Sequence, residues 1–219
     1  MYRLIRLTAL ATLTCFASVA HAVPLTVANF SFEDPATAPT PSVTDWSAPA
    51  GGVDPGTFGF AASAHGSQHL YLQLPGFAGT DPSTATSAAG TIGAVAAGTY
   101  TLTVAAGRRT NASAVTNGDY IIELLADGVV IGSDTFSDPL ANWAPGSWND
   151  MTAIVGIALG STLVGQDLGI RLSVTGGPAG GGHQGQFDNV RLDFVEVPAP
   201  APVPLLGLAL LALRATRQD

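Results

Sequence analysis

Two carboxylates, Glu33 and Asp188, are the residues of this sequence whose setting most clearly points to chemistry. Asp188 opens Phe187–Val195, whose strict alternation predicts a strand with Asp188, Val190, Leu192 and Phe194 on one face. A carboxylate on the apolar, inward face is costly unless it is paired, so it either accepts backbone N–H bonds or binds a cation. A cation needs a second ligand, and the other end of the chain supplies Glu33, which closes Asn29-Phe30-Ser31-Phe32-Glu33.

The histidines His65, His69 and His183 carry a weaker signal. His65 and His69 are four residues apart, but Leu70–Leu74 predicts a strand, on which residues with this spacing do not converge on one metal. The sequence has no glutamate between them and no Gly-x-Ser-x-Gly motif, which argues against a zincin or a nucleophile elbow. A pair of carboxylates acting as in a glycoside hydrolase stays open.

Aromatic and arginine side chains offer a second kind of site. Trp143 and Trp148 flank a short Pro-Gly segment, and sugar faces stack on such rings. Arg108 and Arg109 follow a predicted strand and either hold a carboxylate or hydroxyls of a ligand or form a solvated loop pair. We therefore take Trp143, Trp148 and Arg108 as candidate ligand-binding residues, and we expect Trp46 to lie in the core.

The composition excludes several classes of function. The chain has 219 residues, a net charge of −8, and arginine as its only basic residue type apart from histidine. Nucleic-acid binding needs a basic surface, which this chain lacks. Its one cysteine, Cys15, lies in the leader, so the mature chain has no disulfide, cysteine nucleophile or zinc–thiolate site.

The first residues read as an export signal. Met1–Ala22 combines Arg3 and Arg6 with an apolar run and a small-x-small cleavage site, which is typical of a secretory signal peptide. The run is short for a membrane anchor. We expect residues 1–22 to form a signal helix that is removed and residues 23–196 to form one domain.

Short strand patterns, rather than helices, must hold these side chains in place. No sustained 3.6-residue period is visible, and eight or nine β segments alternate with turn signals. Asp127-Gly128 predicts a tight hairpin between Tyr120–Leu125 and Val129–Phe136. The expected fold is an all-β antiparallel sandwich or jelly roll. The other expected strands are Leu25–Phe32, His69–Leu74, Thr91–Val95, Tyr100–Ala105, Trp148–Ile157, Leu168–Val174 and Phe187–Val195, with loops at Asp34–Pro49 and Gly176–Gly182.

The C-terminal residues 197–219 form a separate segment. Val197–Pro204 is a proline-rich spacer, Leu205–Leu213 is apolar, and Arg214 and Arg217 follow. This order resembles the PEP-CTERM sorting signal that bacterial exosortases process, although Val-Pro-Ala-Pro replaces the usual Val-Pro-Glu-Pro. The resemblance implies a short apolar helix, an exosortase as partner, and only transient contact with the membrane through the signal and C-terminal segments.

The core resembles the β-sandwich of PEP-CTERM surface proteins and the galactose-binding-like carbohydrate-binding modules. The matching motifs run along the core in the expected order: Asn29–Glu33, Asp45-Trp46, Gly66–His69, Gly98–Leu102, Gly165–Leu172 and Phe187–Leu192. In such modules the opening Glu and the closing Asp often bind a structural Ca²⁺. The resemblance therefore implies Ca²⁺ at Glu33 and Asp188, helped by carbonyl groups around Ser67, and oxygen ligands of this kind suit that ion.

The sequence thus predicts a secreted, non-enzymatic β-sandwich at the cell surface or in the extracellular matrix of a bacterium. It would contain a structural calcium and be open to polysaccharide binding. Two alternatives remain: a purely structural matrix or adhesion module without a ligand pocket, and a glycoside hydrolase-type enzyme.

Overall fold

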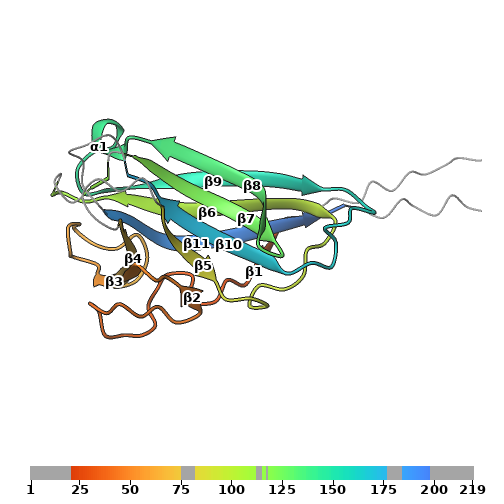
Figure 1. Cartoon of the computed structure of the whole chain (residues 1–219), viewed down its shortest axis with the longest axis horizontal. Helices are drawn as coiled ribbons and strands as arrows, with labels where there is room; N and C mark the ends of the chain where they lie inside the picture. The colour runs from red at the N-terminus through yellow and green to blue at the C-terminus, as the bar shows by residue number, and fades with distance from the viewer. Residues whose placement is uncertain (1–20, 75–81, 112–114, 117, 177–183, 198–219) are drawn as a thin grey trace, which may run out of the picture. The chain divides into compact units, whose positions relative to one another are not determined.

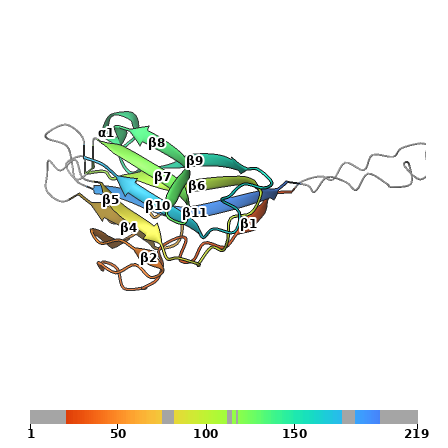
Figure 2. The same ribbon diagram turned by 45° about the vertical axis from the view of Figure 1, so that its right-hand side comes forward.

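The computed structural model describes residues 21–74, 82–111, 115–116, 118–176 and 184–197, which form two antiparallel sheets. Figures 1 and 2 show the two sheets as layers, with the orange segment that contains β2 and β3 beside β4 and the red β1 beside β11. The predicted signal helix and C-terminal apolar helix lie outside the described residues. Among the residues described, no helix has the length and apolar character needed to cross a membrane.

The first sheet has the strand order β3-β4-β11-β6-β9, and β1 pairs with the second half of β11. The second sheet has the order β2-β5-β10-β7-β8. The strands of the first sheet are β1 (Val23–Leu25), β3 (Gly51–Pro55), β4 (Gln68–Gln73), β6 (Gly98–Arg108), β9 (Ser147–Ile157) and β11 (Gln184–Glu196). Those of the second are β2 (Trp46–Ser47), β5 (Ser83–Ser87), β7 (Asp119–Ala126), β8 (Val129–Ser137) and β10 (Leu168–Val174); a single helical turn, α1 (Pro139–Asn142), follows β8.

The predicted antiparallel sandwich is confirmed, and so is its hairpin. Strands β7 and β8 pair from Asp119↔Ser137 to Ala126↔Val129, and the two residues between them have positive φ, 45° for Asp127 and 78° for Gly128. This backbone matches the primed turn that joins two twisted strands with least strain.

Three strands were not predicted from the sequence, namely β3, β5 and the two-residue β2, which lies in the predicted loop Asp34–Pro49. Two predicted strands are shorter than expected. Strand β3 begins with Gly51-Gly52, and β5 reads Ser-Thr-Ala-Thr-Ser, so neither shows apolar alternation. Gly52 is required, because a Cβ there would lie 2.1 Å from the Thr40 carbonyl oxygen. Of the predicted strand Leu25–Phe32, only Leu25 lies in a strand, as the last residue of β1. The predicted strand Thr91–Val95 contributes only an isolated bridge.

The core lies between the two sheets and is filled by their facing side chains. Tyr120 is fully buried there, and its hydroxyl donates to the Gly107 carbonyl at 2.8 Å. Trp46 is buried as expected, and its ring nitrogen donates to the Ala28 carbonyl. Each large apolar side chain of this kind contributes about 1.5–3 kcal/mol on burial. The largest fully buried apolar side chains are Phe32, Phe187, Leu70, Leu72, Leu102, Ile122, Leu124, Leu168, Ile170 and Leu172.

A β-bulge in β11 overturns the predicted alternation of that strand. Asn189 has a φ of 49°, and the pairing with β6 shifts register between Asp188 and Arg191. The extra residue changes which face the following side chains take. Phe187 therefore shares the core with Val190, and Asp188 lies on the opposite, outer face of the first sheet.

Candidate active site on the outer face of the first sheet

The outer face of the first sheet carries two rows of neighbouring side chains. The strand register pairs Gly52 with Tyr71, Tyr71 with Gln186, Gln186 with Gly107, and Gly107 with Trp148. In the next row Asp54 pairs with His69, and Asp188 pairs with Ala105, which pairs with Asp150. We use the name polar face for Asp54, His69, Tyr71, Gln186 and Asp188.

An aromatic pair closes over part of the polar face. Phe60, from the loop of residues 56–67, stacks on Trp148 with ring centroids 4.3 Å apart. Both rings meet the edge of His69, at 5.1 Å and 5.4 Å between centroids. The Trp148 ring nitrogen donates to the Ala62 carbonyl at 3.0 Å and so ties the loop to β9. Gly107 leaves room for the pair, because a Cβ there would lie 2.6 Å from Trp148 and 2.7 Å from Phe60.

His69 is fully buried and has no hydrogen-bond partner for either ring nitrogen. Burial lowers its pKa to about 3, and the positive charge of Arg109 acts in the same direction. The imidazole is therefore neutral at physiological pH, with one donor and one acceptor unused. A buried polar atom without a partner costs about 1–3 kcal/mol, so a histidine in this setting lowers the stability of the fold.

Gln186, from the neighbouring strand, shows the same anomaly. It is fully buried, and neither its amide nitrogen nor its amide oxygen has a partner. Gln68 shows how a buried glutamine is normally accommodated in this chain. Its nitrogen donates to the carbonyls of Phe32 and Pro35, and its oxygen accepts from the Ala38 N–H at 2.9 Å.

A buried arginine and a buried carboxylate adjoin these groups. Arg109 is 6% exposed, its guanidinium lies 4.1 Å from the centre of the Phe58 ring, and it donates to the Gln184 side chain. The interpretation of Arg109 as part of a solvated loop pair is therefore wrong, because the loop of Phe58 covers it. Burial raises the pKa of Asp54, and the charge of Arg109 opposes that rise.

Asp188 accepts backbone hydrogen bonds from His65 and Asn189, both at 2.7 Å, and the Ala64 N–H also favours its ionised form. Its full burial raises its pKa to about 7, and the negative charge of Glu33 contributes to the rise. Glu33 in turn accepts from the N–H groups of Ser67 and Gln68, both at 2.8 Å, and from the Ser67 hydroxyl at 2.7 Å. Both predicted metal ligands thus lie against one stretch of backbone, residues 65–68.

The three candidate ligand-binding residues do not form one site. Trp148 is on the outer face, in the aromatic pair described above. Trp143 lies in the core, 8% exposed and stacked on Phe136 at 4.4 Å. Arg108 donates to the Trp143 carbonyl and holds the end of β6 to the segment after α1. Of the three, the structure brings only Trp148 to the polar face.

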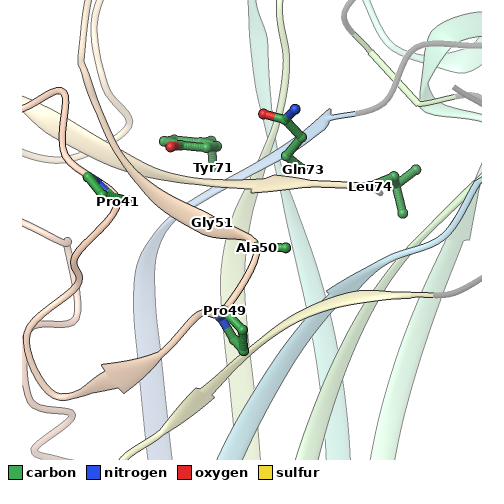
Figure 3. Close-up of a pocket in the computed structure, with 7 residues that line it drawn as sticks. All are labelled: Pro41, Pro49, Ala50, Gly51, Tyr71, Gln73 and Leu74. Atoms are coloured by element: carbon green, nitrogen blue, oxygen red, sulfur yellow. The ribbon is translucent and has the colours of Figure 1, made fainter. Parts of the chain in front are cut away.

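An open cleft of about 350 Å³ adjoins the polar face at the edge of β3 and β4. Figure 3 shows the Tyr71 ring between Pro41 and Gln73, with Pro49 and Ala50 across the β3 backbone. The charge of Asp54 helps to raise the pKa of Tyr71, although burial is the larger cause, so these two groups are within electrostatic reach. The remaining lining residues are Gly51 and Leu74.

The sequence interpretation missed Asp54, Gln186 and the burial of Arg109, and it gave His69 no role. One signal was available. His69, Tyr71 and Gln73 alternate with Leu70, Leu72 and Leu74, which places three polar side chains on one face of β4. Nothing in the sequence showed that the loop of residues 56–67 would bury part of that face.

The family model of the HpiC1-like cyclases, described as HpiC1 cyclase, matches residues 23–193. The chain belongs to this family. No curated protein matched the sequence.

Solved structures support the fold. A cyclase from Fischerella sp. TAU aligns with a TM-score of 0.66 and 22% identity, over 82% of this chain and 100% of that one. The Fischerella sp. TAU cyclase in complex with 4-(1H-indol-3-yl)butan-2-one aligns with a TM-score of 0.64 and 22% identity, over 80% of this chain and 100% of that one. The tandem CBM22 domains of Xyn10C from Paenibacillus barcinonensis align with a TM-score of 0.50 and 13% identity, over 85% of this chain and 50% of that one.

The prediction of a non-enzymatic module is wrong, because the chain belongs to a family of cyclases. The likeness to carbohydrate-binding modules holds for the β-sandwich fold. That fold is shared by proteins of different function, so it was a poor guide to activity.

Proposed function

We propose that this protein is a cyclase that closes a ring on an aromatic, largely apolar substrate at the polar face. The observation that carries the proposal is the set of buried polar side chains without partners beneath Phe60 and Trp148, in a chain of a cyclase family. Ligand sites commonly combine apolar walls with a few polar groups of this kind.

The substrate class follows from the walls of the site. Phe58, Phe60 and Trp148 offer ring faces, and the adjoining cleft adds Tyr71 and Pro41. Flat aromatic compounds stack on such surfaces. The similar Fischerella structures include one in complex with 4-(1H-indol-3-yl)butan-2-one, and we extend that class, indoles with a short side chain, to this chain.

Two buried carboxyl groups, Asp54 and Asp188, can supply a proton. Ring closure onto an alkene begins when a proton adds to one carbon and leaves a cation that the second group attacks. A general acid works best when its pKa is near the working pH. Asp188, with a pKa of about 7, meets this condition, whereas the charge of Arg109 works against a proton on Asp54. Aromatic faces stabilise the positive charge that develops.

The experiment is a product assay with an indole that carries an alkenyl side chain. Closure by proton addition and later proton loss leaves the mass unchanged, so the product is an isomer with a new retention time. We expect Asp188→Asn to lower the rate about 10²–10⁴-fold with retained folding. An unchanged rate in that variant would remove Asp188 from the mechanism, and no isomer across a panel of alkenyl indoles would overturn the substrate class.

Calcium binding at Glu33 and Asp188 is an alternative proposal for the same carboxylate. It is supported by the closeness of both groups to the backbone of residues 65–68. The two roles exclude each other, because a calcium ligand must be ionised whereas an acid must hold a proton. The response of the melting temperature to calcium, described below, separates them.

Export remains part of the proposal and concerns residues outside those described. Residues 1–22 would direct secretion, and an exosortase would process residues 197–219. Mass spectrometry of the protein isolated from its own cells tests both: we expect an N-terminus near Val23 and loss of the apolar tail. An intact C-terminus in the mature protein would contradict the sorting proposal.

A further inference from the structure

The strongest unexplained feature of the polar face is the pair formed by His69 and Gln186. Gln186 is paired in register with Tyr71, and His69 is the next residue of β4 on that face. Diagonal neighbours on adjacent strands are within reach of long and aromatic side chains. All four polar side-chain atoms of the two residues are buried and without a partner.

The glutamine of this pair contrasts with the other buried glutamine among the described residues. Gln68, the other buried glutamine, makes three hydrogen bonds to backbone groups. Buried polar groups in folded proteins are almost always satisfied in this way. A fold that needed only stability would place apolar side chains at positions 69 and 186, because His69 already contacts two aromatic rings.

The chemistry of the pair defines what it can bind. A primary amide offers donors and an acceptor in one plane, and a neutral imidazole offers one of each. Neither carries a charge, since burial holds the pKa of His69 at about 3. A group that pairs with these two residues therefore needs a hydrogen-bond donor or acceptor and needs no charge.

We propose that Gln186 and His69 are the specificity-determining residues that bind an uncharged N–H or carbonyl group of the substrate. The inference rests on the proposed function for the location of the site. The group would enter along Tyr71, which borders both the open cleft and Gln186. The aromatic pair Phe60–Trp148 would then cover the bound ligand.

The first measurement compares stability without any ligand. Gln186→Leu and His69→Phe each remove unpartnered polar atoms at similar volume, so we expect the melting temperature to rise by at least about 2 °C. Gln68→Leu is the matched control; it removes three satisfied bonds, and its melting temperature should fall. A fall for Gln186→Leu and His69→Phe as well would show that both residues serve the fold through buried water, and would overturn the inference.

The second measurement is calorimetric titration with 4-(1H-indol-3-yl)butan-2-one, which carries one N–H donor and one carbonyl acceptor. We expect Gln186→Leu and His69→Phe to weaken binding about tenfold or more although both are stable. Equal affinity in the wild type and both variants would overturn the inference and leave the proposed function standing. No binding to the wild type would instead count against the proposed substrate class, and the stability comparison alone would then decide the inference.

Discussion

Asp188 combines full burial and backbone hydrogen bonds with a pKa near neutrality. The backbone bonds favour its ionised form, but burial outweighs them. A buried group with a pKa this close to the working pH is costly for stability and useful for proton transfer. This balance is why we assign the proton to Asp188 rather than to the exposed carboxylates of the chain.

The raised pKa predicts a specific dependence of stability on pH. The folded state holds the Asp188 proton up to about pH 7, whereas the unfolded chain loses it near pH 3.8, so this residue makes the free energy of unfolding fall as pH rises between those values. Asp188→Asn should remove that fall. Urea unfolding in the presence of a chelator should show the variant gaining stability relative to the wild type from pH 4 to pH 8.

The matched control for this measurement is Asp193→Asn, also on β11 but partly exposed. We expect it to follow the wild type across the pH range. If Asp188→Asn and Asp193→Asn behave alike, the proton on Asp188 is not present in the folded protein.

The calcium proposal makes a different prediction about the same residue. Calcium that binds only the folded state stabilises it by about 2.7 kcal/mol at one hundred times Kd. The melting temperature should then rise with Ca²⁺ and fall with chelator, and Asp188→Ala should abolish the response while Asp193→Ala keeps it. A melting temperature indifferent to Ca²⁺ leaves Glu33 and Asp188 as acceptors for the backbone of residues 65–68.

At the scale of elements, the site depends on how the loop of residues 56–67 packs on β6 and β9. The loop lies close because Gly107 has no side chain, and the stacked rings of Phe60 and Trp148 occupy the space. Because the rings fill this space closely, adding one carbon atom at position 107 should change the packing of the site.

Gly107→Ala should therefore displace the aromatic pair. The added Cβ would lie 2.6 Å from the Trp148 ring, closer than any ordinary contact. Overpacking of this kind costs about 1–3 kcal/mol. We expect a lower melting temperature and a change in tryptophan fluorescence. Gly156→Ala, in β9 with no atom within 4 Å of the new Cβ, is the control and should change neither; equal effects in both variants would contradict the packing of the loop.

The elements also show how far the sequence could predict the structure. The hairpin at Asp127-Gly128 was predictable because turn chemistry is local. The face taken by Asp188 was not, because a single residue, Asn189, enters a left-handed conformation and shifts the register. The polar face was partly predictable from the alternation of His69 and Tyr71 with apolar residues. The loop of residues 56–67 that covers it has no regular sequence pattern and was not predictable.

At the scale of the whole molecule, composition and fold were misleading guides to activity. Low charge, many glycines and a sandwich fold are shared by binding modules and enzymes. The site that we propose for catalysis has no sequence motif and consists of buried polar groups brought together from β3, β4 and β11. The family match supplied what residue patterns could not.

The folded unit itself is well delimited. Residues from Ala22 to Val197 form one compact unit. We therefore expect the fragment 22–197 to unfold in a single cooperative transition at the melting temperature of the full chain. Differential scanning calorimetry of both proteins checks this, and a broad or strongly lowered transition in the fragment would show that the flanking segments contribute to the fold.

The pairing of β1 with β11 has a mechanical consequence. Val23 pairs with Phe194 and Leu25 with Leu192, so the first and last strands run antiparallel with the two ends of the unit side by side. Force applied between these ends loads the hydrogen bonds between β1 and β11 one after another, in the unzipping geometry. It does not load them all at once, as the shear geometry would. Under tension the unit should release β1 first, at low force, while the long pairing of β11 with β6 still holds the polar face together.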